Sequence, residues 1–167
     1  MMQKFFLAAL LDNKPGVLTH ISGLISRRAF NIESISAGYT EEPDVTRINI
    51  VVSVEDEREL AQVTTQLAKL IDVIKIVNLS EVDSIKRELV LIKVRATKET
   101  RADIINVVNI FRARIVDVSK ENVVIELTGE GDKIDALSEV LSEYGIIEIA
   151  RTGAIALSRG PVPVKAM

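Results

Sequence analysis

The residues best suited to bind a ligand lie in the stretch 10–18, where an apolar run gives way to a helical pattern. Pro15 has a fixed φ and no N–H group, which suits the first turn of a helix, and we expect Asp12 or Asn13 to cap that helix. Gly16 has no side chain, so a ligand can approach the backbone closely there. Backbone N–H groups at a helix start lack intrahelical partners and lie at the positive end of the helix dipole. The stretch therefore predicts an anion-binding turn.

This turn offers both donors and acceptors to a small zwitterion. The N–H groups of Gly16, Val17 and Leu18 would hold a carboxylate, and the amide of Asn13 can donate and accept beside them. A free amino acid carries a carboxylate and an ammonium group, so it is the ligand class that these residues suit. The alternative is an ordinary capped loop that binds nothing.

A second polar residue, Asn31, stands among apolar neighbours just after the helix predicted for residues 15–28. A helix of about 13 residues spans roughly 20 Å, so one domain cannot bring Asn13 and Asn31 onto the same small ligand. Two domains related by a two-fold axis can, because the helix start of one then meets the helix end of the other. We therefore expect a site shared across a dimer interface, unless Asn31 merely turns the chain.

Composition argues against several other functions. The chain has no cysteine and a single histidine, so thiolate metal sites, disulfides and a Ser-His-Asp triad are not expected, and His20 is interpreted as a solvated helix residue. A net charge of −3 with interspersed signs gives no footprint for nucleic acid. The apolar run 5–11 is too short to span a membrane and lacks the features of a signal peptide. The absence of cysteine fits a reducing cytosol.

The surrounding pattern predicts an α+β fold built from a repeated β-α-β-β-α-β unit, the ferredoxin-like arrangement with both helices on one face of an antiparallel sheet. The first unit comprises strand 4–11, helix 15–28, strand 30–39, strand 46–54, helix 56–70 and strand 73–79. Either Ser53 or Asp56 can cap its second helix.

The same order recurs in the second half of the chain, where Gly145 is expected to end the last helix. We predict two domains, residues 1–80 and 87–167, joined by a linker at 81–86, with 154–167 as an extended arm of the second. Only the first half has an Asn-x-Pro-Gly turn before its first helix, so the argument for an anion site applies to that half alone.

These motifs resemble known sequences. Residues 12–18 are similar to the turn that opens the first helix of ACT domains, which bind small regulatory ligands. Residues 27–34, Arg-Arg-Ala-Phe-Asn-Ile-Glu-Ser, resemble the Arg-Gly-Tyr-Asn-Ile-Glu-Ser signature of the regulatory (small) subunit of acetolactate synthase. Residues 70–73 and 150–160 agree, and the resemblance covers essentially the whole chain. Ala29 stands where the signature has glycine, which matters only if φ is positive there.

The resemblance implies a function. Members of this family do no chemistry and need no cofactor of their own; they activate a catalytic large subunit that uses thiamine diphosphate, Mg²⁺ and usually FAD. They also confer feedback inhibition by valine or another branched-chain amino acid, which binds between two N-terminal ACT domains. The resemblance implies a cytoplasmic homodimer or higher oligomer. It assigns the following effector-binding residues: Asn13, Gly16, Val17 and Leu18 from one domain, and Asn31 and Ile32 from the other.

A second hypothesis is a stand-alone ACT amino-acid sensor that regulates another enzyme or a transcription factor. The sequence shows no basic recognition helix, which weighs against direct binding to DNA.

Overall fold

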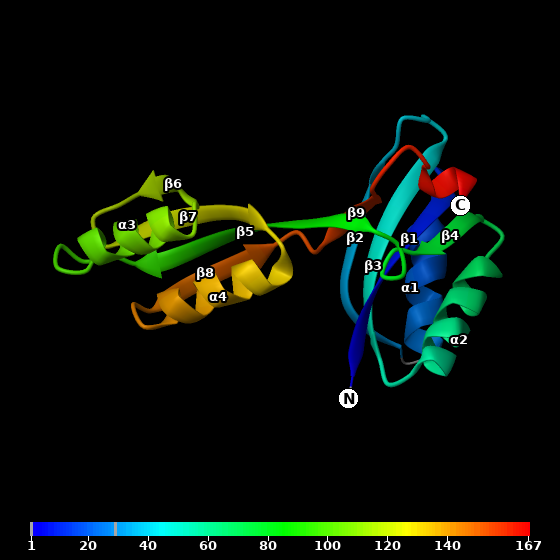
Figure 1. Cartoon of the computed structure of the whole chain (residues 1–167), viewed down its shortest axis with the longest axis horizontal. Helices are drawn as coiled ribbons and strands as arrows, with labels where there is room; N and C mark the ends of the chain where they lie inside the picture. The colour runs from blue at the N-terminus through cyan, green and yellow to red at the C-terminus, as the bar shows by residue number, and fades with distance from the viewer. Residues whose placement is uncertain (1, 29) are drawn as a thin grey trace. The chain divides into compact units, whose positions relative to one another are not determined.

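A computed structural model describes residues 2–28 and 30–167, so Ala29 lies outside the described residues. The chain divides into two compact units (Figure 1). The N-terminal unit comprises Met1–Ile85 together with Ala154–Met167, and the second unit comprises Lys86–Gly153. The C-terminal tail (residues 154–167) therefore packs with the first unit, whereas the sequence analysis grouped it with the second.

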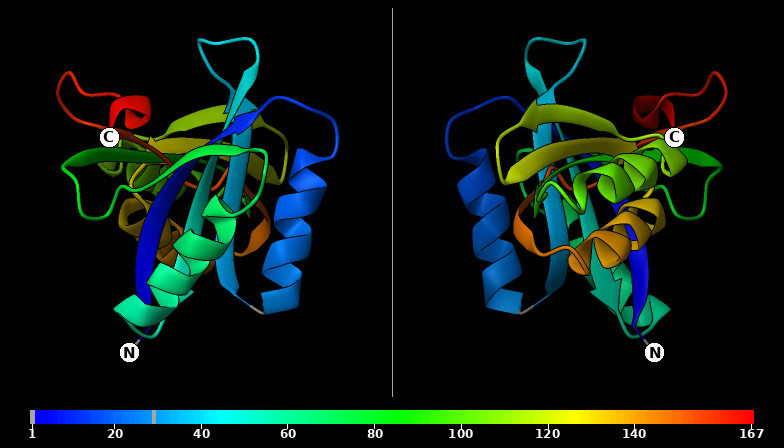
Figure 2. Two further views of the ribbon diagram at one scale, coloured as in Figure 1. Left: turned by 90° about the vertical axis from the view of Figure 1, so that its right-hand side faces the viewer. Right: turned by 90° about the vertical axis from the view of Figure 1, so that its left-hand side faces the viewer.

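The N-terminal unit has the predicted β-α-β-β-α-β order. Its antiparallel sheet has the strand order β2-β3-β1-β4, and both helices cover the same face of it (Figure 2). The α+β, ferredoxin-like prediction is confirmed. The elements are β1 (Gln3–Asp12), α1 (Val17–Arg28), β2 (Asn31–Tyr39), β3 (Val45–Val54), α2 (Glu57–Ala68) and β4 (Val73–Asn78).

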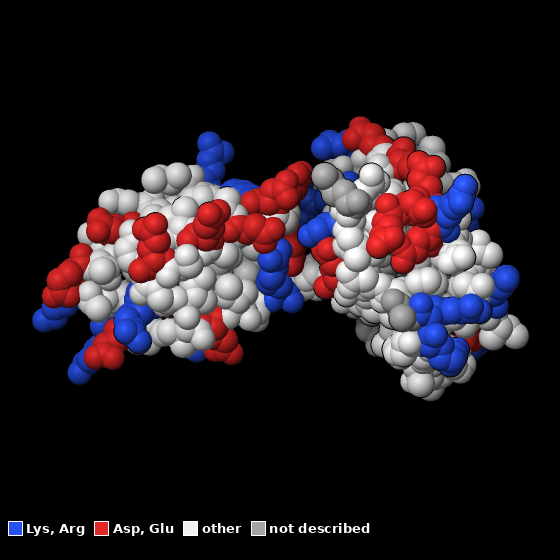
Figure 3. Space-filling model, turned by 90° about the horizontal axis from the view of Figure 1, so that it is seen from below, with Lys and Arg blue, Asp and Glu red and all other residues white. Residues whose placement is uncertain are grey.

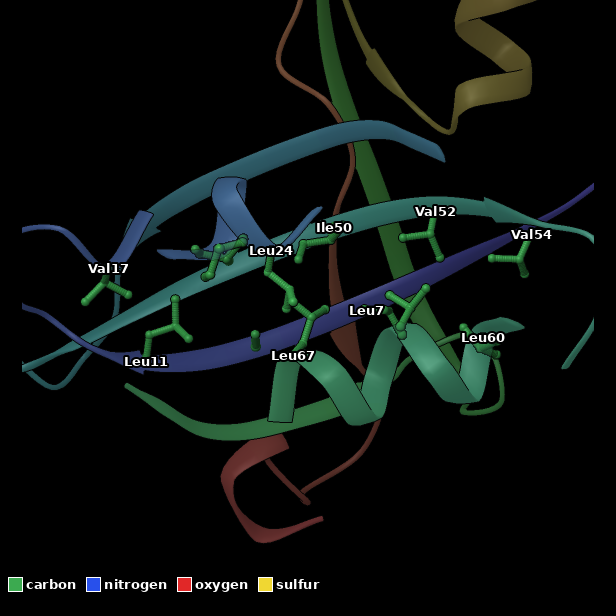
Figure 4. Close-up of a cluster of buried hydrophobic side chains, with 13 residues drawn as sticks. Leu7, Leu11, Val17, Leu24, Ile50, Val52, Val54, Leu60 and Leu67 are labelled. Atoms are coloured by element: carbon green, nitrogen blue, oxygen red, sulfur yellow. The ribbon is translucent and has the colours of Figure 1, made fainter. Parts of the chain in front are cut away.

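The main core of this unit lies between the sheet and its two helices (Figure 4). Alternate residues of β3 face the helices because successive side chains of a strand point to opposite faces. They meet helix residues that recur every three or four positions and so share one face. Full burial of each large aliphatic side chain contributes about 1.5–3 kcal/mol. The cluster includes Leu7, Leu11, Val17, Ile21, Leu24, Ile48, Ile50, Val52, Val54, Leu60, Val63 and Leu67.

The start of α2 confirms one of the two caps considered from the sequence. Asp56 has an extended backbone, and its carboxylate accepts hydrogen bonds from the N–H groups of Arg58 and Glu59, each at 2.9 Å. Ser53 is instead buried within β3, and its hydroxyl donates to the carboxylate of Glu33. The Asp56 cap fixes where the helix begins, because it satisfies two N–H groups that have no intrahelical partner.

The opposite face of the N-terminal sheet is covered by the C-terminal tail. The tail contains β9 (Ile155–Ser158) and a short 3-10 helix, η1 (Val164–Ala166), which lies beside β4 (Figure 1). Ala156 and Val164 are only 5% and 3% exposed. They form a second buried cluster with Ala8, Leu10 and Leu79. The nearly continuous apolar sequence of β1 is thus explained, since both faces of this central strand are buried.

The second unit repeats the strand order of the first, as β6-β7-β5-β8. Its core contains Val90, Ile92 and Val94 of the sheet packed against Ile104 and Leu137 of the helices. β5 begins at Ser84, so residues 84–86 of the predicted linker belong to a strand. The elements are β5 (Ser84–Arg95), α3 (Arg101–Ile110), β6 (Arg114–Val118), β7 (Asn122–Gly129), α4 (Gly131–Ser142) and β8 (Ile146–Arg151).

Each helix of the second unit is followed, within three residues, by a residue with positive φ. Gly145 follows α4 with φ +94°, as its predicted role requires. After α3 the corresponding position is Arg112, with φ +54°, and it is the one non-glycine residue with positive φ in the described part of the chain. Residues that carry a Cβ atom are strained in this conformation, so Arg112 lowers the stability of the second unit.

A partly buried ion pair joins Glu88 of β5 to Arg151, the last residue of β8. The guanidinium of Arg151 donates to both carboxylate oxygens of Glu88, at 2.8 and 2.9 Å, and to Asp135 at 2.7 Å. Glu88 is only 8% exposed, so removing Arg151 would leave a buried carboxylate without its main hydrogen-bond donor. Elsewhere the charges are mixed, and both signs occur on the face of each unit drawn in Figure 3.

Candidate functional site

The turn between β1 and α1 is built around Gly16. The Gly16 carbonyl accepts the first helical hydrogen bond, from the His20 N–H at 3.1 Å, so Gly16 itself occupies the N-cap position. The prediction that Asp12 or Asn13 caps the helix is wrong, as is its predicted start at Pro15, because α1 begins at Val17. Gly16 has φ +88°, which reverses the chain in a conformation that glycine adopts without strain.

The N–H groups at the start of α1 are available to a ligand. The Val17 N–H lies 3.5 Å from the Lys14 carbonyl oxygen, which makes at best a weak hydrogen bond. Among the described residues, the N–H groups of Leu18 and Thr19 have no acceptor. A Cβ atom added to Gly16 would meet nothing within 4 Å, so the backbone can be approached from that side. This end of the helix has the properties of an anion site.

The side chain of Asn13 is held beside this turn by the β2–β3 hairpin loop (residues 40–44). Its Nδ2 donates to the Pro43 carbonyl at 3.1 Å, and its Oδ1 accepts from the Thr46 hydroxyl at 3.1 Å. Its backbone N–H donates to the Asp44 carbonyl at 2.8 Å. One Nδ2 hydrogen and one Oδ1 lone pair remain for a ligand. Asn13 is therefore oriented rather than mobile.

The charged groups around the turn are paired with one another. Lys14 Nζ lies 2.6 Å from the Asp12 carboxylate, and this hydrogen bond raises the pKa of Lys14. His20 is exposed, as predicted. It also has a partner, because its Nδ1 lies 2.9 Å from the Asp72 carboxylate. The Lys14 ammonium against Asp12 lowers the repulsion between that carboxylate and an approaching anion.

The side chains of Val17 and Leu18 differ sharply in exposure. Val17 is 6% exposed and packs in the main core, so it can offer a ligand only its backbone. Leu18 is 54% exposed, and its side chain is free to contact an apolar group. The sequence analysis assigned both residues to the site without distinguishing these roles.

Asn31 and Ile32 lie at the other end of α1, at the start of the edge strand β2. Asn31 is exposed, whereas Ile32 is half-buried and packs against the main core. The 12 residues of α1 extend over about 18 Å, so Asn13 and Asn31 of one chain do not share a small ligand. The structure brings together Asn13, Gly16, Val17 and Leu18, and it separates them from Asn31 and Ile32.

Sequence reasoning missed the hairpin residues that hold Asn13. The register of the sheet pairs Leu11 with Thr46, which brings Thr46 close to Asn13. The alternation of β3 identifies Thr46 as the polar first member of an otherwise apolar face. That exception to the pattern was the available signal.

The described part of the chain comprises residues 2–28 and 30–167. Within those ranges no three histidine, cysteine or acidic side chains are grouped so as to hold a metal ion. In the same ranges, no helix combines the length and apolar character needed to cross a membrane.

The fold and the turn at α1 define a chain made of two ACT-like domains. A family model described as "AHAS small subunit-like ACT domain" matches residues 7–75, and one described as "Small subunit of acetolactate synthase" matches residues 87–160. The chain belongs to the family of acetolactate synthase small subunits.

Individual relatives agree along nearly the whole length. The chain is 56% identical to the acetolactate synthase small subunit of Mycolicibacterium smegmatis over 93% of this chain and 91% of that one. It is 49% identical to the corresponding protein of Bacillus subtilis over 89% and 86%. The crystal structure of the small subunit from Thermotoga maritima superposes with a TM-score of 0.85 at 39% identity, covering 96% of this chain and 99% of that one.

Proposed function

We propose that this chain is the regulatory subunit of an acetolactate synthase and that its effector is valine or another branched-chain amino acid. The turn at Gly16 carries this proposal. Unpaired N–H groups at the start of α1 suit the carboxylate of an amino acid, and the remaining lone pair of Asn13 suits its ammonium group. The exposed Leu18 side chain suits a branched aliphatic group beside them.

The complete effector site is proposed to form between two copies of the chain. Asn13 and Asn31 lie at opposite ends of α1, so both can act on one ligand only if a second copy supplies one of them. Asn31 and Ile32 lie on the edge strand β2, whose outer side pairs with no other strand in the described part of the chain. A two-fold arrangement along this edge would bring the helix start of one copy to the helix end of the other.

The regulatory role is exerted on a catalytic large subunit. Family membership supports a non-catalytic role for this chain. We propose that the partner holds thiamine diphosphate, Mg²⁺ and FAD and that this chain raises the partner's activity. Binding of the effector is proposed to cancel this activation. The complex is proposed to act in the cytoplasm.

One experiment tests the proposal directly. Acetolactate formation by the catalytic subunit from the same source is measured with and without this chain, and valine, leucine and isoleucine are then titrated separately. We expect no turnover by this chain alone, stimulation of the catalytic subunit, and inhibition by at least one branched-chain amino acid. Light scattering should give at least a dimer.

Absence of any stimulation would overturn the regulatory assignment. Stimulation without inhibition by any of the three amino acids would overturn the effector proposal and leave the partner proposal standing.

A further inference from the structure

We propose that the C-terminal tail controls the effector turn, with two positioning residues: Thr46 holds Asn13 directly, and Lys165 holds it through the β2–β3 hairpin loop. This inference rests on the proposed function, because it concerns the same effector site. It gives the tail a regulatory role in addition to its packing role.

The first step is the orientation of the Asn13 amide. Nδ2 faces the Pro43 carbonyl and Oδ1 faces the Thr46 hydroxyl, both at 3.1 Å. Rotation of the amide by 180° would place Oδ1 against the Pro43 carbonyl, where two acceptors repel. The hairpin loop and Thr46 therefore fix which atom Asn13 presents to a ligand.

The second step is the attachment of the hairpin loop to the tail. Inside the loop, the Glu42 N–H donates to the Thr40 hydroxyl at 3.1 Å, and the Val45 N–H donates to the Glu42 carbonyl at 3.0 Å. The carboxylate of Glu42 points outward to Lys165 Nζ, 2.5 Å away. The same loop supplies the carbonyls of Pro43 and Asp44, which accept hydrogen bonds from Asn13. Because Glu42 directly precedes these two residues, a movement of Glu42 would also move the groups that hold Asn13.

The third step is the seating of the tail on β3. The guanidinium of Arg47 donates to the Ala156 carbonyl at 2.6 Å, and the Ala156 N–H donates to the side chain of Asn49 at 3.4 Å. Arg47 directly follows Thr46 in the chain, so the tail contacts the strand that carries the hydroxyl holding Asn13. Burial lowers the pKa of Arg47, which nevertheless stays charged because guanidinium pKa values are so high.

The tail is also the segment by which the chain returns from the second unit. It begins at Ala154, directly after the last residue of that unit, Gly153. The tail is thus covalently attached to the second unit at one end, and near its other end Lys165 contacts the hairpin loop that holds Asn13. Effector binding and the seating of the tail are expected to favour each other equally, because such coupling is reciprocal.

The direct link is tested with Thr46→Val and Thr46→Ser in the full-length chain. Valine binding is measured by calorimetry and folding by thermal unfolding. We expect Thr46→Val to bind valine about fivefold more weakly, since a neutral hydrogen bond to Asn13 is lost. Thr46→Ser keeps the hydroxyl and should bind like the wild type. A purely structural role would lower the melting temperature and leave the affinity unchanged.

The link through the tail is tested by exchanging two charges. Glu42→Lys and Lys165→Glu each place like charges together and should weaken valine binding about threefold, whereas the double exchange should restore it. Lys69→Glu is the matched control, because Lys69 is exposed and its side chain has no ion pair in the described part of the chain. It should bind like the wild type.

The outcomes separate this inference from the function on which it rests. If the wild-type chain binds no branched-chain amino acid, the proposed function fails. If the wild type binds valine but Thr46→Val and both single charge variants bind it equally well, the positioning role is wrong. Equal weakening in the double exchange would likewise overturn the role of the Glu42–Lys165 pair.

Discussion

Replacing Gly16 by aspartate should abolish effector inhibition while leaving activation of the catalytic subunit largely intact. Gly16 lies where a ligand carboxylate would meet the N–H groups of Leu18 and Thr19. The new carboxylate could accept hydrogen bonds from the same groups, and a Cβ atom at this position meets no other atom within 4 Å. The aspartate would therefore occupy the anion site without displacing its surroundings.

Two energies decide the size of the effect. Because Gly16 has φ +88°, any side chain there adds backbone strain of about 1–2 kcal/mol, which lowers stability. Two like charges about 4 Å apart repel by about 4 kcal/mol at an effective dielectric constant of 20. That repulsion corresponds to almost a thousandfold loss of affinity for an anionic ligand. The expected loss of binding free energy from charge repulsion is therefore larger than the free energy of the backbone strain.

Gly16→Asn is the matched control because it carries nearly the same shape and backbone strain without the charge. Both variants should melt about 2–8 °C below the wild type. Valine titrations of the reconstituted enzyme should then show a much larger loss of inhibition for Gly16→Asp than for Gly16→Asn. Equal inhibition of the wild type and a folded Gly16→Asp variant would place the effector site elsewhere. Equal losses in the two variants would show that strain, and not charge, is responsible.

Three further predictions concern stability. Arg112→Gly should raise the free energy of unfolding of the second unit by about 1 kcal/mol, because it removes a strained φ of +54°; denaturant titration would detect it. Arg151→Met should cost about 3 kcal/mol in the same assay by stranding the buried Glu88 carboxylate, and the double variant with Glu88→Met should lose clearly less. A chain ending at Asp83 lacks the tail that covers Ala8 and Leu10, so it should unfold at lower temperature and bind an apolar dye; unchanged stability would contradict the tail's packing role.

Much of the fold could be predicted because the apolar pattern has few interpretations. The alternation of β3 from Ile48 to Val54 and the helical spacing of Leu60, Val63 and Leu67 each identify one buried face. Repetition of the pattern in the second half then predicted the second sheet, whose strand order matches the first. These features depend on local periodicity, which a single sequence displays.

Other features depend on contacts between distant residues and leave little local signal. Capping at α1 was misjudged because Asp12 and Asn13 are good capping residues, but both are engaged elsewhere, with Lys14 and the hairpin loop. The tail was misplaced because Ala156 and Val164 are single buried residues with no periodic pattern around them. Its partners on β3 are the buried Asn49 and the half-buried Arg47. Their burial and their hydrogen bonds to Ala156 are visible only in the structure.

Because the tail completes the N-terminal unit, residues 1–85 cannot reach their full packing until residues 154–167 have also been synthesised. Domains usually fold in order as they emerge. Here the continuous second unit, Lys86–Gly153, can fold before the first is complete. A nascent chain that stops early would carry an uncovered sheet, with Ala8 and Leu10 open to chaperones and proteases.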